Sequence, residues 1–324
     1  MIVKTTENKS FPNNSSRTVL EDALNSGIVF EHSCKTGQCG VCKTSLLEGS
    51  IKEVKPQLAL SDEEIAEGMF LTCCCAADTD ILIDAVDLSA LHGIETKIFP
   101  ARISELNFHT NNILEVSLRL PPNTDFRFLE GQYVDVINAG IKRSYSIFSS
   151  SDENVIRLLI KRVLEGEMSQ YWFDEAKIND LLRIEGPKGT FFIRDASTPL
   201  LFLATGTGIA PVLSMLSKLD NDPGFEQTQS IALFWGNRSL DEFVIAPSFK
   251  KLNVSIYYVL SRSSEGWKGD VGYVQDIVLS KVSNLKESSV YLCGSEKMIH
   301  DARLVLVNAG ISHSNIFYDA FVKS

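Results

Sequence analysis

Long apolar runs are missing from this 324-residue chain, and so is an excess of basic charge. No uninterrupted stretch approaches the roughly 18 to 20 apolar residues that a membrane-spanning helix needs, and residues 1–10 hold no apolar signal-peptide core. We therefore expect a cytoplasmic protein with no membrane partner. The formal net charge of -10 argues against a nucleic-acid partner, because such binding needs a basic face.

Cysteine is scarce beyond residue 75, where only Cys293 occurs. The other six of the seven cysteines lie within the first quarter of the chain, three of them adjacent at positions 73–75. A disulfide framework would not crowd its cysteines in this way, and a reducing cytosol keeps thiols free. The cysteine distribution therefore indicates metal or redox chemistry in an N-terminal part of the chain.

The length points to several domains, since 324 residues exceed what one hydrophobic core usually organises. With 44% hydrophobic and 22% charged residues, the composition is that of a globular protein and not of a disordered or fibrous one. Each domain can therefore bury a core of ordinary size.

Three cysteines, Cys34, Cys39 and Cys42, have the spacing C-x4-C-x2-C, and Cys73 follows after thirty residues. This spacing is typical of plant-type [2Fe-2S] ferredoxins. Glycines at 37 and 40 give the loop the positive φ values that wrapping a cluster requires. A zinc site is the alternative, but it usually needs a second C-x2-C pair, which the sequence does not offer.

Residues 70–73 (Phe-Leu-Thr-Cys) resemble the stretch that brings the last ligand into ferredoxin-like domains, so Cys73 is the predicted fourth metal ligand. Cys74 and Cys75 are then expected to be packing residues. Helices at 18–26 and 61–67 and strands at 44–48 and 81–84 complete an α+β ferredoxin (β-grasp) domain over residues 1–90.

This first domain is markedly acidic. Residues 1–90 hold 7 Lys and Arg against 14 Asp and Glu, a net charge of -7, whereas the remaining 234 residues hold 24 against 27, a net charge of -3. Such a surface is either simply solvated or an electrostatic docking face for a redox partner.

After a linker near residues 88–100, alternating strand patterns at 101–106, 113–120, 132–137 and 155–163 predict an antiparallel β-barrel domain over residues 98–195. Within it, Arg143-Ser-Tyr145-Ser146 resembles the Arg-x-Tyr-Ser motif of the ferredoxin-NADP reductase superfamily. The resemblance implies that Arg143 faces a flavin phosphate, that Tyr145 packs on the flavin, and that Ser146 hydrogen-bonds near its N5.

Two further segments resemble the same superfamily. Ile160 and Lys161, followed by Gly166, Met168 and Ser169, match its Val-Lys and Gly-x-x-Ser segments, where a glycine turn and a helix N-terminus present amides to a pyrophosphate. Ser169 also suits an N-cap. The Gly-Pro-x-Gly-x-Phe pattern at 186–191 matches the closing strand of the barrel. Because the ferredoxin domain comes first, the resemblance implies FAD and not FMN.

From residue 196 to residue 324 the pattern changes to a doubly wound α/β domain. A buried strand at 200–204, a turn with Gly206, Thr207 and Gly208, and a helix at 212–219 occur in the order that a phosphate site needs. Pro211 replaces the usual third glycine and is compatible with a first helical turn. Further strands are expected at 230–235, 254–260 and 289–293.

Two motifs near the C-terminus complete the resemblance. Cys293, Gly294 and Met298 match the Cys-Gly-x-x-x-Met signature, in which the cysteine lies beside the nicotinamide. The last strand, 316–321, resembles one whose aromatic residue stacks on the flavin, and Phe321 is the candidate. By this resemblance Ser146, Cys293 and Phe321 are the residues nearest the hydride transfer.

The choice between NADH and NADPH depends on the ribose site. Arg238 and Arg262 could form part of a 2'-phosphate site, but Val271 stands where plant NADP reductases have lysine. Asp241 and Glu242 also follow the strand that would carry the ribose. We expect NADH, with NADPH as the less favoured nucleotide.

Together the motifs predict a reductase that passes electrons from NADH through FAD and a [2Fe-2S] cluster to a partner protein. Residues 186–194 and 202–211 look closer to the CDP-6-deoxy-delta-3,4-glucoseen reductases of 3,6-dideoxyhexose synthesis than to oxygenase reductases, although Lys188 departs from their pattern. That resemblance implies a pyridoxamine-phosphate dehydratase as the acceptor. The alternatives are an oxygenase component as the acceptor, and a non-catalytic redox sensor.

Overall fold

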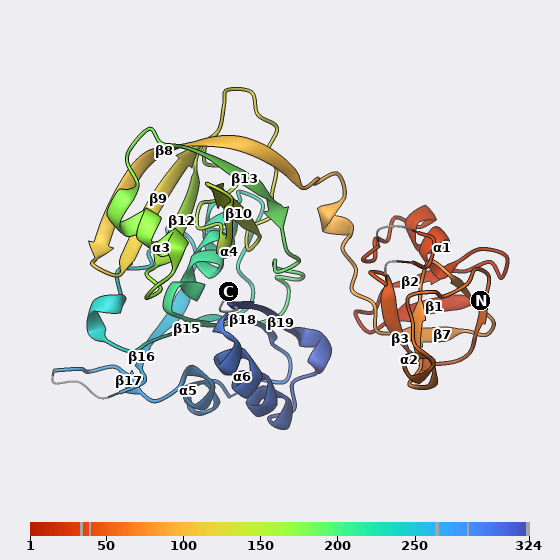
Figure 1. Ribbon diagram of the computed structural model, residues 1–324. Coiled ribbons are helices and arrows are strands. Elements are labelled where there is room, and N and C mark those ends of the chain that lie inside the picture. The colour runs from red at the N-terminus through yellow and green to blue at the C-terminus, as the bar shows by residue number, and fades with distance from the viewer. Residues whose placement is uncertain (33–34, 39, 263–265, 284, 322–324) are drawn as a thin grey trace. The chain divides into compact units, whose positions relative to one another are not determined.

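The computed structural model describes residues 1–32, 35–38, 40–262, 266–283 and 285–321. The chain forms two compact units, Met1–Gly93 and Ile94–Ser324, and each is described by itself (Figure 1). The predicted domain ranges 1–90, 98–195 and 196–324 stay predictions.

Unit 1 is a small mixed sheet with two short helices. Its five-stranded sheet has the order β2-β1-β7-β3-β5, in which β1 and β7 are parallel, and β4 and β6 form a separate antiparallel pair. The elements are β1 (Ile2–Thr5), β2 (Ser10–Pro12), α1 (Val19–Asn25), β3 (Lys43–Glu48), β4 (Ile51–Glu53), α2 (Asp62–Ala66), β5 (Met69–Leu71), β6 (Cys75–Ala77), β7 (Ile81–Ile83) and the 3-10 turn η1 (Ser89–Leu91).

Capping boxes begin both helices of unit 1. Thr18 accepts the backbone N–H of Glu21 while the Glu21 carboxylate accepts that of Thr18, and Ser61 and Glu64 form the same reciprocal pair. The predicted helices therefore begin where their capping residues stand. The predicted strands at 44–48 and 81–84 are also confirmed, within one residue at each end.

The first half of unit 2 is the predicted antiparallel barrel. Its sheet order is β11-β10-β13-β8-β9-β12, and a bridge between Ile147 and Leu158 joins the two ends. Its elements are β8 (Lys97–Thr110), β9 (Ile113–Arg119), β10 (Tyr133–Asn138), β11 (Ile141–Ser146), β12 (Ile156–Lys161), α3 (Glu167–Gln170), the π-helical turn η2 (Tyr171–Glu175) and β13 (Leu181–Lys188). The closing strand thus ends at Lys188, earlier than the resemblance implied.

The second half of unit 2 is a six-stranded parallel sheet of order β17-β16-β15-β14-β18-β19. Its strands are β14 (Leu200–Thr205), β15 (Ile231–Asn237), β16 (Val254–Leu260), β17 (Asp270–Val271), β18 (Ser289–Ser295) and β19 (Ile316–Phe321). Its helices are α4 (Ile209–Asn221), α5 (Val274–Lys281) and α6 (Glu296–Asn308), with 3-10 turns η3 (Gly206–Gly208), η4 (Leu240–Glu242) and η5 (His313–Asn315).

Alternate residues of the central strands pack on opposite faces of this sheet. Leu200, Phe202 and Ala204 pack with α4, whereas Leu201 and Leu203 pack with α5 and α6. A parallel sheet covered on both faces explains why β14 is apolar throughout. The doubly wound fold is therefore confirmed.

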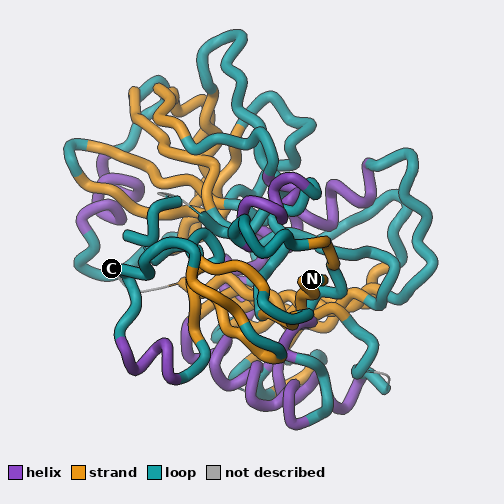
Figure 2. The backbone as a smooth tube through the Cα atoms, turned by 90° about the vertical axis from the view of Figure 1, so that its right-hand side faces the viewer, coloured by secondary structure: helices purple, strands orange, loops and turns teal. Residues whose placement is uncertain are grey.

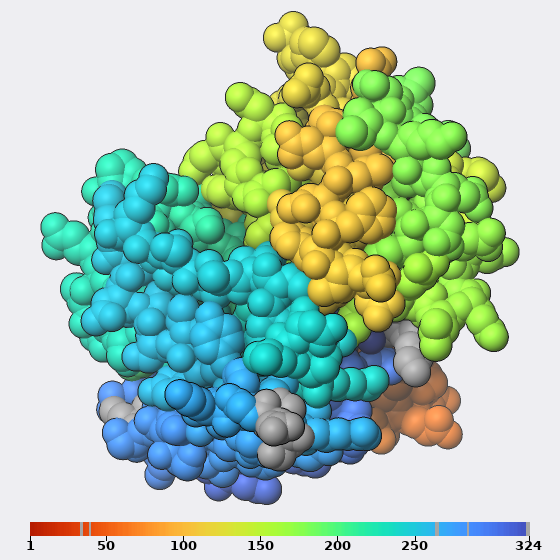
Figure 3. Space-filling model, turned by 90° about the vertical axis from the view of Figure 1, so that its left-hand side faces the viewer, coloured from red at the N-terminus to blue at the C-terminus, as the bar shows by residue number. Residues whose placement is uncertain are grey.

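Strands make up most of the barrel at the top of Figure 2, whereas helices flank the sheet of the nucleotide domain. In Figure 3 the yellow and green residues of the barrel meet the cyan and blue residues of the nucleotide domain along one boundary. Within the described ranges, no helix is long and apolar enough to cross a bilayer.

Candidate functional site

Two of the four predicted cluster ligands, Cys42 and Cys73, face each other in unit 1. Cys42 precedes β3 and Cys73 follows β5, and the antiparallel pairing of Lys43 with Leu71 brings their Sγ atoms to 3.2 Å. Two thiolates on one tetrahedral metal with bonds of about 2.3 Å lie about 3.8 Å apart. The observed distance of 3.2 Å is shorter, so the two sulfurs would move slightly apart to share one iron of a cluster. Cys34 and Cys39 lie outside the described residues.

Hydrogen-bond donors surround these two sulfurs. The backbone N–H of Gly37 lies near Cys73 Sγ and that of Cys73 lies near Cys42 Sγ, and each favours the thiolate form of its neighbour. Burial raises the pKa of Cys42 to about 11 and also raises the pKa of Cys73, so each is a neutral thiol until a metal displaces its proton. Donors to the sulfurs then stabilise the negative charge of a bound cluster.

The glycines of the loop have the predicted conformations. Gly37 and Gly40 have φ of 79° and 71°, and a Cβ at Gly37 would overlap the carbonyl oxygen of Pro56. Residue 37 must therefore be glycine for the loop to lie this close to the segment that precedes α2.

The flavin motif lies on β11, at the edge of the barrel. Arg143 is half-buried and its guanidinium donates to the Lys142 carbonyl. Tyr145 accepts a 3.0 Å hydrogen bond from the indole N–H of Trp172, which is fully buried, and burial raises the pKa of Tyr145 to about 12. Tyr145 is therefore neutral, and its ring is fixed from one side.

The two segments predicted to hold the pyrophosphate follow β12. Ile160 is buried, Lys161 pairs with Glu242 at 2.5 Å, and Met168 is buried in α3. The predicted N-cap is wrong: Gly166 is the N-cap of α3. Ser169 lies inside the helix because its hydroxyl accepts the Val163 N–H at 2.9 Å, which ties the preceding loop to the helix.

The glycine turn and the Cys-Gly signature pack directly on each other. A Cβ at Gly208 would lie 2.7 Å from the Cys293 carbonyl carbon and would overlap its oxygen. Gly294, at φ 153°, leaves no room for a Cβ beside the Thr205 hydroxyl, and the Met298 methyl would be 2.9 Å from it. These residues therefore pack closely against one another at the carboxyl ends of β14 and β18, the edge where ligands of such sheets bind.

The remaining predicted residues of this turn are placed around it. Gly206, at φ 57°, accepts a 3.0 Å hydrogen bond from the Trp235 indole N–H, and a Cβ there would meet open space. Thr207 is half-buried, and Pro211 is buried in the first turn of α4. Open space at Gly206 leaves its backbone accessible to a phosphate group.

The half-buried carboxylate of Asp319, in the nucleotide domain, lies near Ser146 of the barrel. It lies opposite Cys293 in the pairing of β18 with β19, and the nearby Ser146 hydroxyl favours its ionised form. Burial raises the pKa of Asp319 to about 6, and burial together with Asp319 raises the pKa of the fully buried Cys293. Phe321 lies two residues further along β19, opposite Ser295, and is 36% exposed.

Sequence reasoning missed Asp319, although a signal existed. Asp319 and Phe321 are two residues apart on one strand, so their side chains leave the same face of the sheet. A carboxylate in an otherwise apolar last strand needs a polar neighbour, and the Ser146 hydroxyl is one. The structure thus brings together Ser146 and Cys293, two of the three predicted catalytic residues, through a residue that the motifs did not include.

A second buried polar group points to a ligand in the nucleotide domain. Gln275, in the first turn of α5, is 5% exposed, and among the described residues its side-chain oxygen has no hydrogen-bond partner. The Val274 side chain beside it would be 2.8 Å from a Cβ on Gly236, so the start of α5 lies against β15. A buried acceptor without a partner at this edge fits a bound molecule that donates hydrogen bonds.

Below pH 4 the Asp319→Asn variant should be as stable as the wild type, and above pH 6 it should be more stable. A carboxyl group whose pKa is raised on folding, here from 3.8 to about 6, weakens folding as it ionises, by up to about 3 kcal/mol. Urea unfolding from pH 4 to pH 7.5 measures the difference, with exposed Asp276→Asn as the control. An equal difference at every pH would contradict it.

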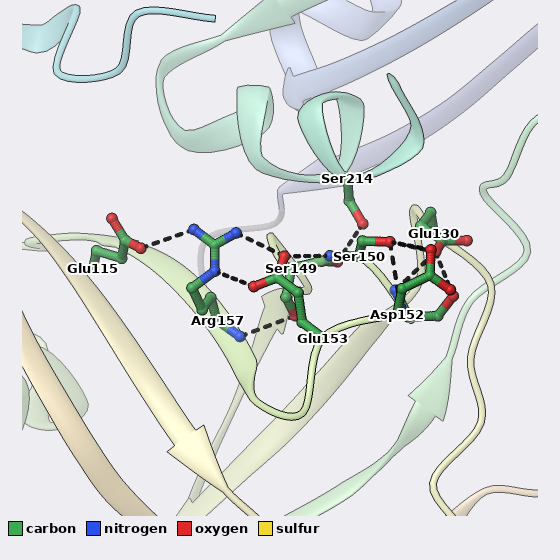
Figure 4. A network of polar contacts seen from close by, with 9 residues as sticks. Glu115, Glu130, Ser149, Ser150, Asp152, Glu153, Arg157 and Ser214 are labelled. Carbon is green, nitrogen blue, oxygen red and sulfur yellow. Dashed lines mark hydrogen bonds and ion pairs between the residues drawn. The ribbon is translucent and has the colours of Figure 1, made fainter. Parts of the chain in front are cut away.

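A polar network fastens the strand that carries the flavin motif to α4 (Figure 4). The fully buried Ser214 hydroxyl donates to the Ser149 carbonyl at 2.6 Å, three residues beyond Ser146. Arg157 donates to Glu115 and Glu153, at 3.1 and 2.8 Å. Because α4 begins at the glycine turn, this network fixes the segment that follows β11 relative to that turn.

The Ser214→Ala variant should lose about 1 to 3 kcal/mol of stability, because the Ser149 carbonyl stays buried without its donor. Urea unfolding of unit 2 measures the loss, and Ser239→Ala, at an exposed serine, should stay within about 0.5 kcal/mol of the wild type. Equal stabilities of the two variants would show that the hydrogen bond is dispensable.

Three family models match the chain in succession. They are described as a 2Fe-2S iron-sulfur cluster binding domain (residues 3–78), an oxidoreductase FAD-binding domain (100–193) and an oxidoreductase NAD-binding domain (202–304). The candidate cluster, flavin and nucleotide residues described above lie within these ranges. Asp319 and Phe321, both on β19, are the exceptions.

Curated relatives match over nearly the full length. The CDP-6-deoxy-L-threo-D-glycero-4-hexulose-3-dehydrase reductase of Yersinia pestis is 38% identical over 97% of this chain and 96% of its own. The toluate 1,2-dioxygenase electron transfer component of Pseudomonas putida is 29% identical over 96% and 94%. Among solved structures, an Amycolatopsis cytochrome P450 reductase superposes with a TM-score of 0.66 at 23% identity, covering 100% and 99%, which shows the shared fold.

Proposed function

The chain belongs to the family of iron-sulfur flavoprotein reductases that includes the CDP-hexulose dehydrase reductase of Yersinia pestis, and from this premise we propose that it supplies electrons to a dehydrase acting on a CDP-linked 6-deoxyhexulose. It is an NAD(P)H-dependent oxidoreductase with binding domains for NAD, FAD and a [2Fe-2S] cluster. We place the reaction in the cytoplasm, where thiols stay reduced.

The bound groups supply the change from two-electron to one-electron chemistry, since flavin accepts a hydride and releases electrons singly and the cluster carries one at a time. The chain's own residues hold these groups in a productive order. Four cysteines are proposed for the cluster: Cys34, Cys39, Cys42 and Cys73.

On the flavin side, we assign Arg143 to the phosphate and Tyr145 to the ring system. Ile160, Lys161, Gly166, Met168 and Ser169 are proposed to border the pyrophosphate. Lys161 is paired with Glu242, so its ammonium lies between the barrel and the nucleotide domain. On the nucleotide side, the proposed contacts are Gly206, Thr207, Gly208, Pro211, Gly294 and Met298.

At the proposed point of hydride transfer, the Ser146 hydroxyl lies near the Asp319 carboxylate and favours its ionised form. Cys293 is buried beneath the same carboxylate, so it acts as a neutral packing group there and not as a nucleophile. Phe321, partly exposed on the same strand face, is placed to cover an aromatic ring system.

The observation that carries the choice of acceptor is the identity of 38% to the dehydrase reductase, against 29% to the dioxygenase component, over equal shares of the chain. An oxygenase component is the second candidate. Purified chain, NADH, the dehydrase and its CDP-sugar should together give a 3-deoxy product. If no such product formed and an oxygenase component were reduced quickly, the oxygenase component would replace the dehydrase as the proposed acceptor.

NADH is the proposed hydride donor. Exposed Asp241 lies in the turn that follows β15, and its negative charge opposes a 2'-phosphate, whereas neighbouring Glu242 is paired with Lys161. Arg238 and Arg262 are exposed residues that follow β15 and β16, and their positive charge would favour a 2'-phosphate. Comparison of kcat/KM for the two nucleotides tests the proposal, and a preference for NADPH would overturn it.

A further inference from the structure

The run of three cysteines at 73–75 has a use beyond supplying one ligand. All three side chains are buried, yet they lie in different surroundings. Cys75 is part of β6 and pairs with Glu53 of β4. Cys74 instead has its Sγ atom 3.6 Å from Cys73 Sγ and 3.4 Å from the Pro56 carbonyl oxygen. The expectation that Cys74 and Cys75 only pack is therefore too simple for Cys74.

The backbone fixes the position of this thiol. The Cys74 N–H donates to Leu71 at 2.9 Å, and the Cys74 carbonyl accepts the N–H groups of Val54 and Lys55 at 2.8 and 3.0 Å. On the other side, a Cβ on Gly37 would lie 2.7 Å from Cys74 Sγ. The thiol is thus enclosed between the cluster loop and the turn from β5 to β6 that carries Cys73.

The direction of the hydrogen bond follows from the ligand chemistry. A cysteine bound to iron is deprotonated, so Cys73 Sγ can only accept and Cys74 must donate. The Pro56 carbonyl competes for the same hydrogen. A negatively charged sulfur is the stronger acceptor, since hydrogen bonds to ionised groups are about twice as strong as neutral ones.

We propose that the Cys74 thiol donates a hydrogen bond to the sulfur of Cys73 and thereby raises the reduction potential of the cluster. Reduction adds negative charge to the cluster and its ligand sulfurs, so a donor stabilises the reduced state more than the oxidised one. The inference rests on the proposed assignment of Cys73 as a ligand. It is independent of which protein accepts the electrons.

The test compares two substitutions of Cys74 in the full-length protein loaded with cluster and flavin. Cys74→Ala removes the donor, and Cys74→Ser keeps one of similar size. EPR-monitored redox titration should show that alanine makes the cluster harder to reduce, by up to about tenfold in the equilibrium constant, which is about 59 mV for one electron. Serine should keep the wild-type potential or raise it, and the control Cys75→Ala should leave it unchanged.

Equal reduction potentials for Cys74→Ala and the wild type would overturn the proposal. Equal shifts for the alanine and serine variants would do the same, because they would show that the presence of a hydrogen-bond donor at residue 74 makes no difference. If the alanine variant does not hold its cluster, resonance Raman spectra of the wild type decide the matter. Transfer to D2O should shift the iron-sulfur stretching bands in the wild type more than in Cys74→Val. Identical shifts would refute the hydrogen bond.

The ligand assignment is tested separately by the iron content of Cys73→Ala. Loss of iron supports the premise, and a fully retained cluster would overturn the proposal at its base. Neither result depends on product formation with the dehydrase, so failure of the proposed acceptor would be recognised on its own.

Discussion

Replacing Cys42 with alanine should reduce cytochrome c reduction by NADH about 100-fold or more while ferricyanide reduction continues. Removal of a residue that only orients a metal ligand already costs 10- to 100-fold, so removal of a ligand should reach at least the upper limit. Cys42 Sγ is 3.2 Å from Cys73 Sγ, and alanine leaves that sulfur without the neighbour that shares its proposed iron. Unit 2 keeps its own core, so hydride transfer to flavin should persist.

Iron content, visible spectrum and the two activities should be measured on the same preparation. Cys75→Ala is the matched control, because this cysteine is equally buried in the same unit but lies in β6. The prediction fails if Cys42→Ala retains both its iron and its cytochrome c activity. If ferricyanide reduction were lost as well, the substitution in unit 1 would also have impaired the reaction of NADH with the flavin in unit 2.

Replacing Gly208 with alanine should lower kcat/KM for NADH about 100-fold. The new methyl group would overlap the Cys293 carbonyl oxygen, and neither backbone can move without shifting β18 or the start of α4. Displacement of a reacting group by about 1 Å costs on the order of 100-fold in rate. Both the nucleotide turn and the Cys-Gly signature would be displaced by the same substitution.

Gly224→Ala is the control in the same domain, since Gly224 is exposed and a Cβ there would approach only the Asp222 side chain, at 3.5 Å. Its kcat/KM should equal that of the wild type. FAD content should be unchanged in both variants, because the barrel supplies the proposed flavin contacts. Wild-type kinetics for Gly208→Ala would show that the turn adapts to a methyl group.

The local pattern predicted most elements because each carries its own signal. Capping residues marked the helices of unit 1, alternation marked the long barrel strands, and an apolar run followed by a glycine turn marked β14 and α4. The Cys spacing and the superfamily motifs likewise placed the candidate sites. Short strands such as β4 and β6, with three residues each, carry too little periodicity to be predicted.

What the sequence did not reveal depends on contacts between distant segments. Asp319 lies near Ser146, 173 positions earlier in the chain, and no local pattern encodes this proximity. Ser169 was predicted as an N-cap from its residue type, but the loop at Val163 engages its hydroxyl instead. Cys74 and Cys75 are adjacent cysteines, so the sequence does not distinguish them. Only the backbone conformation places Cys74 beside Cys73 and Cys75 within β6.

The burial of Cys293 has a practical consequence for labelling. It is the one cysteine in residues 94–324, it is fully buried, and its pKa is raised well above the usual value. Alkylating reagents attack the thiolate of an accessible cysteine, so unit 2 offers them no ready target. A cysteine introduced at exposed Thr228 would therefore accept a fluorophore selectively within this unit, with the native thiol left in place.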